Sequence, residues 1–278
     1  MAALRKAAVA GSWYPGDPAR LRAEVEGHLQ AADVAPPEGR LVALISPHAG
    51  LRYSGPVAAY GYGLLRGRRG LTAVLVGPSH HVRFEGISLW ARGGFETPLG
   101  VAPVDEGLAS RLLETDLWIR DDPSVHRSEH SLEMQLPFLQ HLVEGLHIVP
   151  ALMGSQSREE VMRLGRALVV AAAGRPEVLL VASSDLSHYH PAARAHALDA
   201  QVAHDVESFD PEALMDRLEG ERGHACGGGA MVAVMRAARE LGALRSQVLR
   251  YADSGDAGDR DKSRVVGYLS ASFTAAAT

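Results

Sequence analysis

The 278-residue sequence contains a single cysteine, Cys226, and only 5 % aromatic residues. One thiol excludes an intrachain disulfide framework and excludes zinc modules built from several cysteines. The scarcity of aromatic residues argues against a large stacking surface. Lysine and arginine together number 28, against 33 aspartate and glutamate residues, so the formal net charge is −5. This mild acidity gives no electrostatic reason to expect a nucleic acid as partner.

Long apolar runs are also missing. The apolar stretch at 167–173 is short and rich in alanine, whereas a membrane-spanning helix needs about 18 apolar residues. The Ala/Val patch after Arg5 and Lys6 is too short for a signal peptide. The sequence therefore predicts a soluble, cytoplasmic protein with no membrane partner. It also contains neither a G-x-S-x-G serine turn nor a G-x-G-x-x-G dinucleotide turn.

Short apolar runs alternate with helical patterns along the chain. Asp17 and Pro18 precede a row of apolar residues at helical spacing, which predicts a capped helix. Further helices are expected at 158–173 and 191–206. The apolar runs, bounded by turn residues, predict buried strands at 41–46, 71–76, 148–152 and 178–182. This alternation predicts an α/β fold with a mixed, largely parallel central sheet flanked by helices.

Two more pairs of short runs favour antiparallel additions to the sheet. Residues 87–90 and 101–104 flank a turn rich in glycine and proline, and residues 248–252 and 265–272 flank a long polar loop. No shift in composition marks a linker, so we expect one domain over residues 1–278.

Histidines follow the predicted strands. His48 and His80 lie in turns directly after two of them, and Asp185 and His188 follow a third. Ligands of open α/β sheets bind at the carboxyl ends of the strands, so these loops are expected to converge on one site. The alternative is that each histidine satisfies polar groups of its own turn.

Cys226 lies in the turn ACGGG, just before a helical pattern at 231–241. The dipole of that helix would favour the thiolate, and the glycine N–H groups could hold an anion. The alternative is a small buried thiol beside a tight turn. With His48 and His80, Cys226 completes a His/His/Cys set that suits iron, copper or zinc better than magnesium or calcium.

The segment from His126 to His130 matches H-x-x-E-H, a pattern of zinc proteases, with Glu129 between the histidines. The polar residues at 120–128 and Pro123 favour a loop instead of the helix that such a site needs. We therefore expect this segment at the rim or wall of the cleft and not as an independent zinc site, with zinc hydrolysis as the weakest of the functional hypotheses.

Six motifs occur in the order seen in the Memo family, which includes AmmeMemoRadiSam system protein B, and the chain resembles that family from about residue 10 to residue 272. The motifs are AGSWYP (10–15), SPHAG (46–50), GPSHH (77–81), EHSLEMQLPF (129–138), SSDLSH (183–188) and ACGGG (225–229).

The resemblance implies a fold like that of class III extradiol dioxygenases, with a metal site in the corresponding cleft. It assigns the metal ligands to His48, His80 and Cys226, with Asp185 and His188 beside them. The true dioxygenases bind Fe(II) with two histidines and a glutamate. A cysteine in the third place argues against ring cleavage, because a soft thiolate changes the electronic properties of the metal.

Two main functions are therefore compared. The first is a mononuclear redox or oxygenase-like enzyme with Fe(II) or copper, zinc being the alternative metal, acting on a small molecule or peptide. Its acid/base and pocket-lining residues would be Asp185, His188, His81, Glu129 and His130. The resemblance also implies a functional link to a radical SAM protein. The second function is a phosphopeptide- or protein-binding module that uses the same cleft, where Arg52 is the one arginine near a motif.

Overall fold

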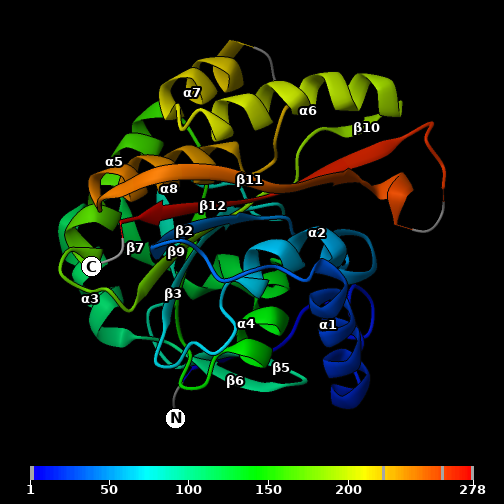
Figure 1. Cartoon of the computed structure of the whole chain (residues 1–278). Helices are drawn as coiled ribbons and strands as arrows, with labels where there is room; N and C mark the ends of the chain where they lie inside the picture. The colour runs from blue at the N-terminus through cyan, green and yellow to red at the C-terminus, as the bar shows by residue number, and fades with distance from the viewer. Residues whose placement is uncertain (1–2, 221–222, 258–259, 277–278) are drawn as a thin grey trace.

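A mixed β-sheet crosses the centre of the molecule (Figure 1). The computed structural model describes residues 3–220, 223–257 and 260–276, so both ends of the predicted 1–278 domain lie outside the described residues. Within these ranges the sheet has nine strands, in the order β10-β12-β2-β9-β3-β8-β4-β7, and β11 pairs with the free side of β12. The strands are β2 (Arg40–Ser46), β3 (Thr72–Pro78), β4 (Ile87–Leu89), β7 (Ile119–Asp121), β8 (His147–Met153), β9 (Val178–Ser183), β10 (His188–His190), β11 (Ala243–Asp253) and β12 (Val265–Ala275).

The four predicted apolar runs form the middle of this sheet. Strands β2, β9, β3 and β8 are neighbours and run parallel. Their side chains are almost all buried, as expected for parallel strands covered on both faces. β12 is antiparallel to β2, and β11 is antiparallel to β12. The predicted α/β fold and its mixed sheet are confirmed.

Helices cover both faces of the sheet. Figure 1 shows α5, α6, α7 and α8 on one side and α1, α2 and α4 on the other. Asp17 caps α1 and Ser157 caps α5 by accepting backbone N–H groups, so both helices begin where the sequence indicates. No described helix has the length and apolar character needed to cross a membrane. The helices are α1 (Pro18–Ala32), α2 (Leu51–Gly63), α3 (Glu106–Thr115), α4 (Leu136–Leu142), α5 (Arg158–Ala172), α6 (Ala192–Glu207), α7 (Pro211–Gly220) and α8 (Gly228–Glu240).

A small second sheet contains one of the two predicted antiparallel segments. Strand β6 (Gly100–Pro103) pairs with β5 (Gly94–Thr97), and β1 (Leu4–Arg5) joins β5 in parallel. The segment 87–90 forms β4 and joins the main sheet antiparallel to β8, as the predicted antiparallel addition. The turn between these two segments itself contains a strand, β5. The predicted antiparallel pair near the C-terminus is correct, as β11 and β12.

The strand order determines where the polar loops lie. β9 lies between β2 and β3, and all three run parallel. Their carboxyl ends therefore share one edge of the sheet. The loops with His48, His80 and Asp185 leave the sheet at that edge, side by side.

Candidate metal centre

The three predicted ligands converge at this edge. One ligand atom from each of His48, His80 and Cys226 lies within 4.8 Å of the others. The Sγ atom of Cys226 is 3.1 Å from Nε2 of His48. His48 and Cys226 are 178 residues apart in the sequence, so the fold and not the local sequence brings them together. A metal ion requires such a convergence of nitrogen and sulfur donors.

His48 is fixed in one ring orientation. Its Nδ1 lies 2.8 Å from the hydroxyl of Ser183, and its backbone N–H donates to Oδ1 of Asp185 at 2.7 Å. Nε2 is therefore the ring nitrogen that faces Cys226. Burial lowers the pKa of His48 well below its usual value, with the neighbouring histidines acting in the same direction. A neutral imidazole is the form that binds a metal.

His80 is oriented by Glu129. Oε1 of this carboxylate lies 2.9 Å from Nδ1 of His80, which leaves Nε2 available as a ligand. Burial alone would raise the pKa of Glu129, but hydrogen bonds from the ring and backbone of His80 and from backbone N–H of Ser131 outweigh it and hold the pKa far below its usual value. A carboxylate behind a histidine fixes its tautomer and strengthens it as a metal ligand.

Cys226 lies two residues before α8, as the sequence predicts, but its surroundings differ from those expected in two ways. Burial, with the nearby Asp185 carboxyl, raises the pKa of the thiol instead of lowering it. The N–H groups of Gly227 and Gly229 donate to Ser184 Oγ and Gln156 Oε1, each at 2.9 Å, so they do not hold an anion. A Cβ at position 227 would overlap the carbonyl oxygen of Ser183. Packing against β9 therefore requires glycine there.

Asp185 lies directly beside the ligands. Its Oδ1 accepts the backbone N–H groups of His48 and Ala49, and its backbone N–H approaches Sγ of Cys226 at 3.3 Å. Burial raises its pKa to about 7, although the two N–H groups act in the opposite direction. A carboxyl group with such a pKa can hold or release a proton near neutral pH.

The other predicted pocket residues surround the same point. The ring of His130 stacks on His80 at 4.5 Å and meets His48 edge-on at 5.6 Å. His81 lies 5.8 Å from His130, on the exposed side. Nδ1 of His188 lies 2.7 Å from the carbonyl oxygen of Leu186. The structure thus brings His80, His81 and His130 close to His48. His80, Glu129 and His130 also form a second group with metal-ligand spacing.

His126 does not form a zinc pair with His130. It ends a short 3₁₀ helix (Pro123–His126), and its Nε2 lies 3.1 Å from the backbone oxygen of Ser88. Its ring packs near Trp90 and Phe95. Neither potential metal group of the described residues contains it. The H-x-x-E-H interpretation is therefore wrong, since the two histidines of the pattern face different surroundings.

A buried ion pair that the sequence does not indicate holds the Glu129 segment. Nη1 of Arg5 lies 2.5 Å from Oε2 of Glu133, and both side chains are almost fully buried. Arg5 also donates to the backbone oxygens of His126 and Glu129. Tyr14 donates its hydroxyl to Oε1 of Glu133 at 2.6 Å. The N-terminal segment is thereby tied to residues 126–133.

Trp13 is a second residue that sequence reasoning did not assign to the site. Its ring lies 4.3 Å from that of His130, and it is 38 % exposed. The available signal was its position in the motif AGSWYP. It places an aromatic wall at the open side of the histidine cluster.

Comparison with known proteins identifies the family of the chain. A family model described as Memo-like protein matches residues 5–272. A MEMO1 family protein of Methanothermobacter thermautotrophicus is 37 % identical over 95 % of this chain and 98 % of its own. One from Sulfolobus acidocaldarius is 36 % identical over 97 % and 99 %. The crystal structure of an uncharacterized protein of Escherichia coli K12 has the same fold, with a TM-score of 0.55 and 15 % identity over 83 % of this chain and 99 % of that one. The chain therefore belongs to the Memo family.

Proposed function

We propose that this protein binds one iron or copper ion through His48, His80 and Cys226 and uses it in redox chemistry on a small molecule. The observation that carries the proposal is the convergence of these three ligands within 4.8 Å. The Nδ1 atoms of the two histidines are held by Ser183 and Glu129. Both rings are thus oriented before any metal arrives, as in established metal sites.

The donor set fits such a metal. Two imidazole nitrogens and one thiol are ligands for iron, copper or zinc, and they are poor ligands for magnesium or calcium. The ion would displace the proton of Cys226, because a coordinating thiol is deprotonated even where burial disfavours the free thiolate. Iron or copper, when bound, would supply electron transfer to or from the substrate.

The residues around the candidate ligands would supply proton exchange and substrate positioning. Asp185 can hold a proton on its buried carboxyl next to Cys226. His130 is kept neutral, because burial lowers its pKa to about 4 against the opposing charge of Glu129. Trp13 covers part of the ring of His130, which limits the access of water on that side. These groups would position a substrate and exchange protons with it.

Phosphopeptide binding through the ACGGG turn is disfavoured, since the N–H groups of Gly227 and Gly229 already donate to Ser184 and Gln156. The zinc hydrolase hypothesis requires His126 and His130 to bind one zinc ion together, but the ring of His126 lies against Ser88. Zinc in the His/His/Cys set remains an outcome of the metal analysis.

Metal analysis of protein purified without oxygen tests the proposal. We expect about one iron or copper per chain, lost in His48→Ala and retained in His147→Ala. The control residue is exposed and begins β8, at the opposite edge of the parallel strands. Zinc as the tightest-binding metal, or full metal content in His48→Ala, would contradict the proposal. Turnover of a redox-active substrate then has to disappear with the metal.

A further inference from the structure

A second feature lies beside the histidine cluster: an open cavity of about 600 Å³. Its walls come from the segments that carry the candidate site. Gly50 lies two residues after His48, Tyr189 follows His188, and Trp13 contacts His130. Strand β12 contributes Val266, which pairs with His188, and Tyr268. The cavity therefore adjoins the segments that carry the candidate site.

Tyr189 adopts a backbone conformation that tyrosine rarely takes. Its φ is +62°, in the left-handed region, and 63 % of the residue is exposed. Such a conformation costs a non-glycine residue about 1 kcal/mol or more, and it is found preferentially where a side chain serves a ligand. Burial cannot explain why an exposed aromatic ring is held there. Its ring lies 5.6 Å from that of His188 and faces the same cavity.

Positive charge accompanies these rings. The guanidinium of Arg264 lies 5.3 Å from the centre of the Tyr189 ring, and among the described residues it forms no ion pair. A second guanidinium, that of Arg52, lies over Tyr53 in the same lining. One carboxylate, Asp261, is also present, and it accepts the backbone N–H of Ser263 at 2.8 Å. The lining therefore combines flat aromatic surfaces with the guanidinium of Arg264.

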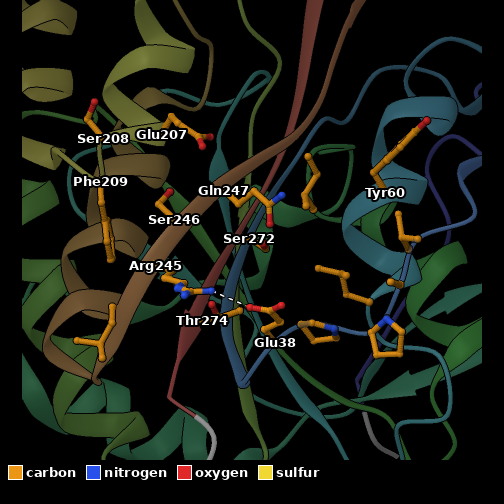
Figure 2. Close-up of a pocket in the computed structure, with 17 residues that line it drawn as sticks. Glu38, Tyr60, Glu207, Ser208, Phe209, Arg245, Ser246, Gln247, Ser272 and Thr274 are labelled. Carbon is orange, nitrogen blue, oxygen red and sulfur yellow. Dashed lines mark hydrogen bonds and ion pairs between the residues drawn. The ribbon is translucent and has the colours of Figure 1, made fainter.

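A larger pocket elsewhere in the described part of the chain provides a contrast. Figure 2 shows this pocket, about 920 Å³, where the cation Arg245 is already paired with Glu38 at 2.8 Å. Thr274 lines it and is in register with Leu41, near the start of β2. His48 follows the other end of that strand. The larger pocket thus lies at the wrong end of the sheet for the metal centre.

We propose that the cavity bordered by Trp13, Tyr189 and Arg264 binds a small planar organic acid. Its carboxylate would lie on Arg264, and its ring or conjugated plane would lie against the aromatic walls. A carboxylate fits better than a phosphate ester, because the single positive charge of Arg264 shares the lining with the carboxylate of Asp261. This inference rests on the proposed function, since it names the class of substrate that the metal centre would meet.

Calorimetric titration of the full-length protein, with and without chelator, tests this assignment. The probes are benzoate, its neutral isostere benzamide, and phenyl phosphate. We expect benzoate to bind most tightly. Arg264→Gln should weaken it about ten- to hundredfold, the usual effect of losing a charged hydrogen bond. Tyr189→Gly suits the backbone conformation and removes the ring, so a loss of about two- to tenfold is expected. Arg245→Gln, the matched control in the larger pocket, should change nothing.

Several results would overturn the assignment: absence of benzoate binding, equal affinity for benzamide, tighter binding of phenyl phosphate, or equal losses in Arg264→Gln and Arg245→Gln. Metal content measured on the same samples separates the two proposals. Absence of benzoate binding in wild-type protein that holds its metal refutes the organic-acid site alone. Benzoate binding in a wild-type protein that takes up neither iron nor copper refutes the metal proposal alone.

Discussion

Glu129 holds His80 at two points: one carboxylate oxygen lies 2.9 Å from the ring Nδ1 and the other 2.5 Å from the backbone nitrogen. The same carboxylate accepts the backbone N–H groups of His130 and Ser131. It thus connects the loop after β3 to the 126–133 segment. The orientation of one candidate ligand therefore depends on a residue that would not itself need to touch the metal.

Glu129→Gln tests this dependence. The amide keeps the shape of the side chain and removes its charge, so the ring of His80 should lose its fixed tautomer. Metal affinity is expected to fall about 10- to 100-fold. Glu26→Gln is the control, because Glu26 makes a similar contact with His141 at 2.8 Å in another part of the molecule. Equal affinity of Glu129→Gln and wild type in metal titrations would show that the carboxylate has a purely structural role.

Cys226→Ser replaces the soft ligand and nearly keeps its volume. A serine hydroxyl ionises poorly, so iron or copper affinity should drop sharply, and any redox activity with it, while the fold survives. Thermal unfolding and anaerobic metal titration measure the two effects separately. Oxygen must be excluded, because oxidation of the thiol would imitate the loss of a ligand. Wild-type affinity in the serine variant would reduce Cys226 to a packing residue.

Arg5→Met leaves the carboxylate of Glu133 buried without its partner. Breaking a buried pair from one side costs about 3–5 kcal/mol, so the free energy of unfolding should fall by that amount in denaturant titrations. Lys6→Ala is a neighbouring control, since the Lys6–Glu96 pair is exposed and should contribute no more than about 1 kcal/mol. Similar losses in the two variants would mean that the Arg5 pair is no stronger than a surface contact.

His126 should make the protein less stable in mild acid. Burial lowers its pKa to about 4, against about 6.5 in an unfolded chain. Between these values the unfolded chain binds a proton that the folded chain does not, so the free energy of unfolding rises with pH across this window and levels off above it. The full contribution is about 3 kcal/mol.

His126→Gln should flatten this pH dependence, and His147→Gln should not. Burial shifts the pKa of His48, His130 and His188 in the same direction. The informative quantity is therefore the difference in slope between the variant and the wild type in urea titrations from pH 4 to 7. Parallel curves would contradict the assigned pKa of His126.

The sequence was most informative where the signal is local. The apolar runs that became β2, β3, β8 and β9 had to be buried, and the residues after a parallel strand had to share one edge with their neighbours. The strand pattern therefore predicts that His48, His80 and Asp185 lie close together. Cys226 could be added because its turn precedes a helix.

Pairings between distant segments could not be read in the same way. Arg5 and Glu133 are 128 residues apart, and nothing in either neighbourhood marks them as partners. The glycines of ACGGG were assigned to a ligand, whereas Ser183 and Gln156 occupy the space around them. The sequence does not link Arg264 to Tyr189, because the pairing of β12 with β10, and not proximity in sequence, brings the two residues together.

The thiol of Cys226 offers a way to measure how much of the protein carries a metal at the candidate site. It is the sole cysteine of the chain, and its sulfur lies 3.1 Å from a ligand nitrogen of His48. Every thiol-specific label or alkylating agent therefore reports on this one position, with no background from other cysteines. A metal-free sample gives the protection from alkylation that burial of the thiol alone provides. Additional protection in the loaded protein would follow metal occupancy, so an ordinary mass measurement could quantify loading.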